Sequence, residues 1–139
     1  MQLTVRTEIN ASVSEIWRAY TTPSDIMRWN AASNDWHTTK SVVDLQPGGR
    51  FCSRMEAKDG SFGFDFEGTY TDIVENSLIA YEFGGRNAKV DFNVTEQGTR
   101  VTVTFDSEDA HTAEQQQQGW LSFLDNFKKY VESSLGSEG

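Results

Sequence analysis

Residues 112–135 constrain the fold most, because their apolar side chains recur at the spacing of an α-helix. The segment contains no proline and a single glycine, Gly119. Apolar residues three or four positions apart fall on one stripe of a helix, and a broad stripe needs an apolar partner. The segment therefore predicts a long helix packed against a sheet. The stripe comprises Trp120, Leu124, Phe127, Val131 and Leu135, widened by Phe123 and Tyr130.

The N-terminal segment predicts one strand followed by two short helices. Apolar and polar residues alternate over residues 2–9, as they do in a half-buried strand. Ser12 and Glu15 have the spacing of a capping box, which marks the start of a helix. Pro23 suits the first turn of a second helix, because a proline there leaves no N–H unpaired.

About six further strands are predicted between these helices and the long one. Gly- and Pro-containing turns separate runs of alternating apolar residues, and such short connections indicate antiparallel hairpins with one solvated face. Strands grouped together with helices at both ends make an α+β domain. We expect one domain over residues 1–135 and a flexible tail over residues 136–139. The expected strands are 38–45, 50–57, 62–70, 78–83, 89–95 and 100–105.

The composition is that of a folded protein with an acidic surface. The chain has 139 residues, of which 37% are hydrophobic, and this is enough for one domain with a real core. A net charge of −9 disfavours nucleic acid and anionic membranes as partners. No apolar run is long enough to span a bilayer, and residues 1–9 lack the hydrophobic core of a signal peptide. We expect a cytoplasmic protein.

Several segments, taken in order, resemble one known family. They are residues 13–23, Trp29, residues 43–51, residues 66–70 and the Gly119-Trp120 pair. Their order and spacing are similar to those of the activator of heat-shock-protein ATPase homologue family, AHSA-type, in the START-like (SRPBCC, polyketide cyclase/dehydrase-like) superfamily. The resemblance implies a helix-grip fold, in which a curved antiparallel sheet of six or seven strands wraps a C-terminal helix and two short helices close one end.

The resemblance also bears on activity. In many relatives a cavity between the sheet and the long helix binds an apolar small molecule. The eukaryotic co-chaperone that gives the family its name uses an additional N-terminal domain, for which this chain has no room. We therefore do not expect ATPase activation. The superfamily includes lipid carriers, hormone receptors and cyclases, so the fold alone does not decide the function.

Large aromatic residues are the candidate lining of such a cavity. Aromatic walls bind apolar ligands through the area they bury, although ordinary core packing is an open alternative for each residue. Trp29 and Trp36 are the strongest candidates, because they flank a polar loop near the expected mouth. The candidates are Trp29, Trp36, Phe51, Phe64, Phe66, Phe92, Trp120 and Phe123.

The sequence contains no recognisable metal or catalytic motif. His37 and His111 are its only histidines, and neither has a second ligand-type residue at metal spacing. Cys52 is the only cysteine, and its place in a strand predicts a small, partly buried apolar side chain. His37 lies beside Asp35 and near Arg28, which would suit proton transfer at the mouth; an ordinary surface histidine is the alternative.

Charged residues on the strands are expected to face solvent. Asp65 and Glu67 alternate with phenylalanines, so they point away from the core if the phenylalanines point into it. Arg50 and Arg54 share one face of their strand. They would bind a ligand carboxylate if that face pointed inward. We favour a surface position for both.

We therefore expect a binding protein for a hydrophobic or aromatic small molecule, with no cofactor, no metal and no catalytic residue. A curved sheet and a straight helix cannot touch along their full lengths, which leaves a cavity. Because most carboxylates alternate away from the apolar face, we expect no acid–base pair with strongly perturbed pKa values inside it. The alternatives are a cyclase- or hydrolase-like enzyme acting on an aromatic metabolite, and an interaction module. We expect a monomer or homodimer.

Overall fold

The computed structural model describes residues 1–31 and 33–138, with side chains through Ser133. Its elements follow the predicted order of one strand, two short helices, six strands and a long helix. They are β1 (Gln2–Ile9), α1 (Val13–Thr21), α2 (Pro23–Trp29), β2 (Trp36–Val43), β3 (Arg50–Ala57), β4 (Gly63–Val74), β5 (Leu78–Phe83), β6 (Arg86–Thr95), β7 (Gly98–Asp106) and α3 (Ala113–Glu138).

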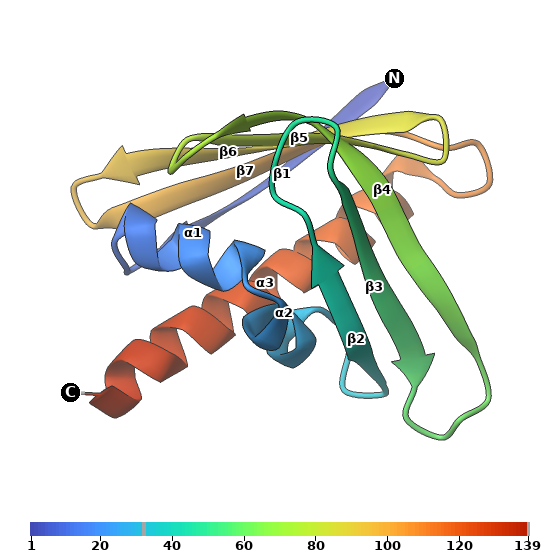
Figure 1. The fold of residues 1–139 in the computed structure, drawn as a ribbon, viewed down its shortest axis with the longest axis horizontal. Coiled ribbons are helices and arrows are strands. Elements are labelled where there is room, and N and C mark those ends of the chain that lie inside the picture. The colour runs from blue at the N-terminus through green and yellow to red at the C-terminus, as the bar shows by residue number, and fades with distance from the viewer. Residues whose placement is uncertain (32, 139) are drawn as a thin grey trace.

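The seven strands form one antiparallel sheet that curls around α3 (Figure 1). The strand order is β1-β7-β6-β5-β4-β3-β2, so β2 to β7 are joined as successive hairpins and β1 pairs with β7 at one edge. The register of β4 against β5 shifts between Tyr70 and Asp72, and a bulge of this kind increases the local twist. The arrangement is the helix-grip α+β fold predicted from the sequence.

Helix-capping signals take their predicted roles, and one more is present. The Ser12 side chain accepts a hydrogen bond from the Glu15 N–H at 3.4 Å, and Pro23 lies in the first turn of α2. Thr112 and Gln115 form a second capping box, in which each N–H donates to the other residue's side-chain oxygen at 3.1 Å. Gln115, the first residue of the glutamine run, therefore has a structural role as a capping residue of α3.

The core lies between the concave face of the sheet and the predicted stripe of α3. Leu124, Phe127 and Val131 are 3%, 0% and 4% exposed. Trp120 is half-buried. The side chain of Leu135 lies outside the described residues.

Some element ends differ from the prediction. The strands β2, β6 and β7 begin two or three residues earlier than expected, and β4 ends later, because residues that flank the alternating runs also pair in the ladders. The backbone of α3 continues to Glu138, while the side chains of the predicted tail and all of Gly139 lie outside the described residues. No helix in the described part of the chain is both long and apolar enough to cross a bilayer.

Candidate ligand-binding site

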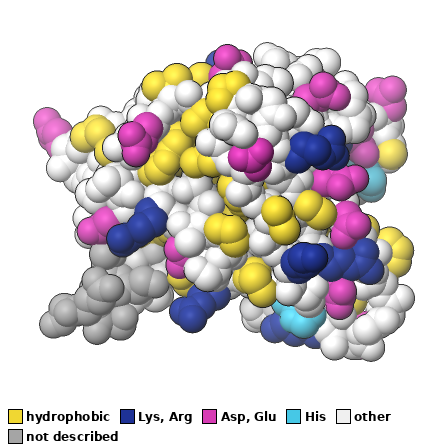
Figure 2. Space-filling view, viewed as in Figure 1, with side chains coloured by type: hydrophobic (Ala, Val, Ile, Leu, Met, Phe, Trp, Pro, Cys, Tyr) yellow, Lys and Arg dark blue, Asp and Glu magenta, His cyan; other side chains and the backbone are white. Residues whose placement is uncertain are grey.

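A cavity of about 300 Å³ lies between the concave face of the sheet and α3. On the face of the molecule shown in Figure 2, apolar side chains gather in the middle and charged ones lie mostly toward the periphery. Among the described lining residues, Arg86 alone carries a charge. The aromatic lining residues are Tyr20, Trp29, Phe51, Phe64, Phe66, Tyr70, Tyr81, Phe83, Trp120 and Phe123.

Two of the eight predicted lining residues lie elsewhere. Phe92 is 4% exposed and packs edge-on against Trp17 and Tyr20, with ring centroids 5.2 and 5.7 Å away, because α1 covers this part of the sheet. Trp36, at the start of β2, packs against Phe62 and Phe64 near the β3–β4 turn. It borders a separate, polar pocket. The other six candidates, Trp29, Phe51, Phe64, Phe66, Trp120 and Phe123, do line the cavity.

Trp29 forms a rigid part of the wall at the end of α2. Its indole N–H donates to the Ala19 carbonyl at 2.9 Å, so the buried nitrogen is paired. Its ring lies 4.8 Å from Phe127 and 5.1 Å from Tyr20, measured between centroids. These contacts fix the ring orientation and make Trp29 both a core residue and a cavity residue.

Phe51 occupies the middle of the sheet wall, and Gly68 makes room for it. The Phe51 ring lies 5.1 Å from both Tyr70 and Tyr81. A Cβ atom on Gly68 would approach this ring to 2.8 Å and the Glu82 carbonyl oxygen to 2.4 Å. The absence of a side chain at Gly68 therefore leaves room for the Phe51 ring, which a side chain at this position of β4 would displace.

The family match fits this geometry. The sequence matches the family described as Activator of Hsp90 ATPase homolog 1-like protein over residues 10–132. The chain belongs to this family. An AHSA1-like protein from Aeromonas hydrophila has 48% identity and a TM-score of 0.92, with 96% of this chain and 94% of that chain covered.

Two further solved structures extend the comparison. A protein from Cytophaga hutchinsonii is 38% identical over 97% of this AHSA1-like chain and 94% of its own, with a TM-score of 0.82. A protein from Chromobacterium violaceum shares the fold, with 20% identity, a TM-score of 0.84, and coverage of 95% of this chain and 98% of its own. No curated protein matches the sequence.

Three tyrosines that sequence reasoning missed line the cavity of this family member. Within the described residues, the hydroxyls of Tyr20, Tyr70 and Tyr81 have no hydrogen-bond partner. Burial raises the pKa of each tyrosine. The charge of Tyr70 adds to the effect on the pKa of Tyr20, and the charge of Asp44 to that on Tyr70. The charges of Tyr20 and Tyr70 add to the effect on the pKa of Tyr81. Buried tyrosines in the cavity were not anticipated from the sequence, which led only to the expectation that no acid–base pair would lie there. A tyrosine at an apolar, inward-facing position was the available signal.

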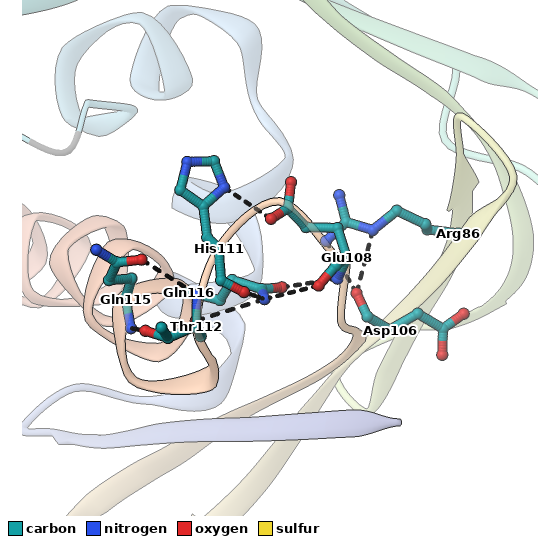
Figure 3. A network of polar contacts seen from close by, with 7 residues as sticks. All are labelled: Arg86, Asp106, Glu108, His111, Thr112, Gln115 and Gln116. Atoms are coloured by element: carbon teal, nitrogen blue, oxygen red, sulfur yellow. Dashed lines mark hydrogen bonds and ion pairs between the residues drawn. The ribbon is translucent and has the colours of Figure 1, made fainter.

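Arg86 adds a guanidinium to the same wall. Its Nε and Nη2 donate to the Asp106 carbonyl at 3.1 and 2.9 Å (Figure 3), and its Cζ lies 4.7 Å from the centre of the Phe83 ring. These contacts hold the side chain at the junction of β6, β7 and the loop that leads to α3.

The β7–α3 loop is fixed by a buried glutamine. Gln116 is 8% exposed, and its side chain accepts from the Glu108 N–H at 2.9 Å and donates to the Glu108 and His111 carbonyls at 3.1 and 2.9 Å (Figure 3). His111 precedes α3, as expected, and its Nδ1 lies 2.7 Å from Glu108 Oε1. This hydrogen bond lowers the pKa of Glu108. The network has a structural role.

The charged residues of β3 and β4 lie on the outer face of the sheet, as predicted. Arg54 pairs with Asp65 at 3.5 Å and with Glu56 at 3.2 Å, and Arg50 lies 3.9 Å from Glu67. Neither arginine lines the cavity. Cys52 is half-buried on the same face, where burial and then the carboxylates of Asp65 and Glu67 raise its pKa.

A second, polar pocket of about 210 Å³ adjoins the cavity at Trp29 and Asn30. The predicted mouth residues Arg28 and His37 line it, and Trp36 forms part of its wall, whereas Asp35 does not. In the described part of the chain, no group of three or more His, Cys, Asp or Glu side chains is arranged to hold a metal ion.

Proposed function

We propose that this chain is a binding protein for a hydrophobic or aromatic small molecule, which it holds in the cavity between the sheet and α3. The aromatic lining of a cavity of about 300 Å³ carries the proposal. Burial of apolar surface stabilises a complex by roughly 25 cal/mol per Å², and small-molecule sites combine such walls with a few polar groups. The fold alone does not carry it, since the helix-grip architecture serves several functions.

An enzyme acting in the same cavity is the second candidate, because three tyrosine hydroxyls face the cavity. The described lining includes neither a histidine nor a carboxylate. Tyrosines are protonated near neutral pH and burial raises these pKa values further, so none of the three is a ready general base. These facts favour binding over catalysis.

The test uses naphthalene as a purely apolar probe and backbone amide NMR shifts as the readout. We expect the shifts to concentrate on the cavity-facing residues of the sheet and α3. Ser53→Leu should reduce the affinity at least about tenfold, because Ser53 lines the cavity and is 6% exposed, so a larger side chain fills ligand space.

Cys52→Leu is the matched control, because it adds similar bulk one residue away on the opposite face of β3. It should bind naphthalene as the unmodified chain does. Well-dispersed spectra of both variants establish that they fold. Absence of naphthalene-induced shifts in the unmodified chain, or equal affinities in both variants, would refute the proposal.

A further inference from the structure

The polar groups of the cavity wall lie within electrostatic reach of one another. Burial raises the pKa of Tyr81, the charges of Tyr20 and Tyr70 add to this rise, and the charge of Arg86 opposes it. All four residues line the cavity. These four side chains, the polar surface of the cavity, lie in a mostly apolar lining.

The hydrogen-bonding capacity of this surface is largely unused within the protein. A hydroxyl without a protein partner costs free energy when protein atoms enclose it, whereas one that reaches a cavity can bond water or a ligand there. In the described part of the chain, the hydroxyls of Tyr20, Tyr70, Tyr81 and Ser53 have no protein partner and, unlike that of Ser41, are not enclosed; all four residues line the cavity. A bound molecule with oxygen acceptors would supply partners that the protein does not.

Arg86 determines which acceptor fits. A guanidinium has five N–H donors, and here Nε and Nη2 both point to one neutral carbonyl, that of Asp106. Among the described residues, no carboxylate lies within 4.0 Å of Arg86. Since charge-assisted hydrogen bonds are the stronger ones, an anionic oxygen group is favoured over a neutral carbonyl. A ligand ammonium would be repelled.

We propose that the ligand is an aromatic carboxylate, whose oxygens accept hydrogen bonds from the Tyr81 hydroxyl and the Arg86 guanidinium. The ring system lies against the aromatic walls formed by Phe51, Phe66 and Trp120. This inference rests on the proposed function and names the chemical class of its ligand.

Three probes of nearly the same shape test it: naphthalene, 2-acetylnaphthalene and 2-naphthoate. We expect 2-naphthoate to bind the unmodified chain about tenfold or more tightly than naphthalene, with 2-acetylnaphthalene between them. Tyr81→Phe removes one hydroxyl and keeps the ring. It should weaken 2-naphthoate about tenfold and reduce the preference for 2-naphthoate over naphthalene by a similar factor.

Tyr130→Phe is the matched control, because the Tyr130 hydroxyl bonds Asp25 and its side chain does not line the cavity. It should change no affinity. Arg86→Gln should reduce the preference for 2-naphthoate over 2-acetylnaphthalene; if this variant does not fold, the Tyr81→Phe result still decides.

The failures are distinguishable. Naphthalene binding in the cavity without a preference for 2-naphthoate, or without an effect of Tyr81→Phe on 2-naphthoate, refutes the carboxylate inference and leaves the proposed function standing. A preference for 2-acetylnaphthalene over 2-naphthoate also refutes it. If no probe shifts the cavity amides, both proposals are wrong.

Discussion

The indole of Trp120 on α3 stacks on the ring of Phe105 on β7, with centroids 4.1 Å apart and planes 5° from parallel. Phe105 is fully buried, whereas Trp120 also lines the cavity. One tryptophan thus joins the helix to the sheet and completes the cavity wall. Further along α3, Phe127 is 0% exposed and lies against Trp29 and Tyr20.

Phe127→Ala is expected to destabilise the protein by about 3–5 kcal/mol, through lost burial and the cavity left behind. Trp120→Ala should cost less, because part of the Trp120 surface already faces a cavity and not packed atoms. Denaturant unfolding of both variants measures the difference. Equal and large losses at the two positions would mean that Trp120 is packed on all sides and that the cavity is filled.

Gly68→Ala is expected to disturb the ligand cavity although Gly68 does not line it. The new Cβ would overlap the Glu82 carbonyl and the Phe51 ring, so β4 or Phe51 must move. We expect destabilisation of about 1–3 kcal/mol, as for other overpacked sites, and weaker binding of naphthalene. Gly84→Ala in the β5–β6 turn is the comparison for backbone strain without overlap. Gly84 lies at positive φ, but its added Cβ would meet no atom within 4 Å. If Gly68→Ala lowers the stability but leaves naphthalene binding unchanged, Gly68 does not influence the shape of the cavity.

Thr112→Ala tests the capping box at the start of α3. The Thr112 hydroxyl accepts from the Gln115 N–H, and its loss leaves that donor to water. We expect a loss of about 1 kcal/mol in the free energy of unfolding. Thr112→Ser keeps the hydroxyl and should retain most of the stability. If alanine and serine are equally tolerated, the cap contributes nothing measurable.

The sequence predicted the fold well because periodicity and turn chemistry are local signals. The alternation in β3 and β5 and the capping residue Ser12 each identify an element without knowledge of its partners. The ends of β4 and β6 were less accurate. Pairing with β5 extends β4 beyond its alternating run, and it extends β6 into a segment whose composition suggests a turn.

The site was harder to predict. The alternation along a strand identifies which residues point inward, but it does not show whether they pack against a helix or line a cavity. Phe92 and Phe51 both point inward, yet α1 covers Phe92 while Phe51 remains at the cavity. Tyr81 was overlooked for a related reason. Its hydroxyl matters only because no group in the described part of the chain pairs with it, and this depends on three-dimensional neighbours. Arg86 is the first residue of β6, in the segment between the expected strands 78–83 and 89–95 where the sequence predicted a turn.

Alkaline pH is expected to destabilise the folded protein. Burial raises the pKa of Tyr20, Tyr70 and Tyr81 in the folded protein above the ordinary value of 10.0. Below pH 10 both states hold these protons, so the tyrosines add no pH dependence. Above it the unfolded chain releases protons that the native state retains, so stability falls as the pH rises, by up to about 1.4 kcal/mol per pH unit for each such tyrosine. Unfolding measured between about pH 9 and about pH 11 should show this decline, and Tyr81→Phe should reduce the slope by roughly one proton. An unchanged slope in Tyr81→Phe, or Tyr81 absorbance that titrates near its ordinary pKa in the folded protein, would show that its hydroxyl is open to bulk water and not enclosed in the cavity.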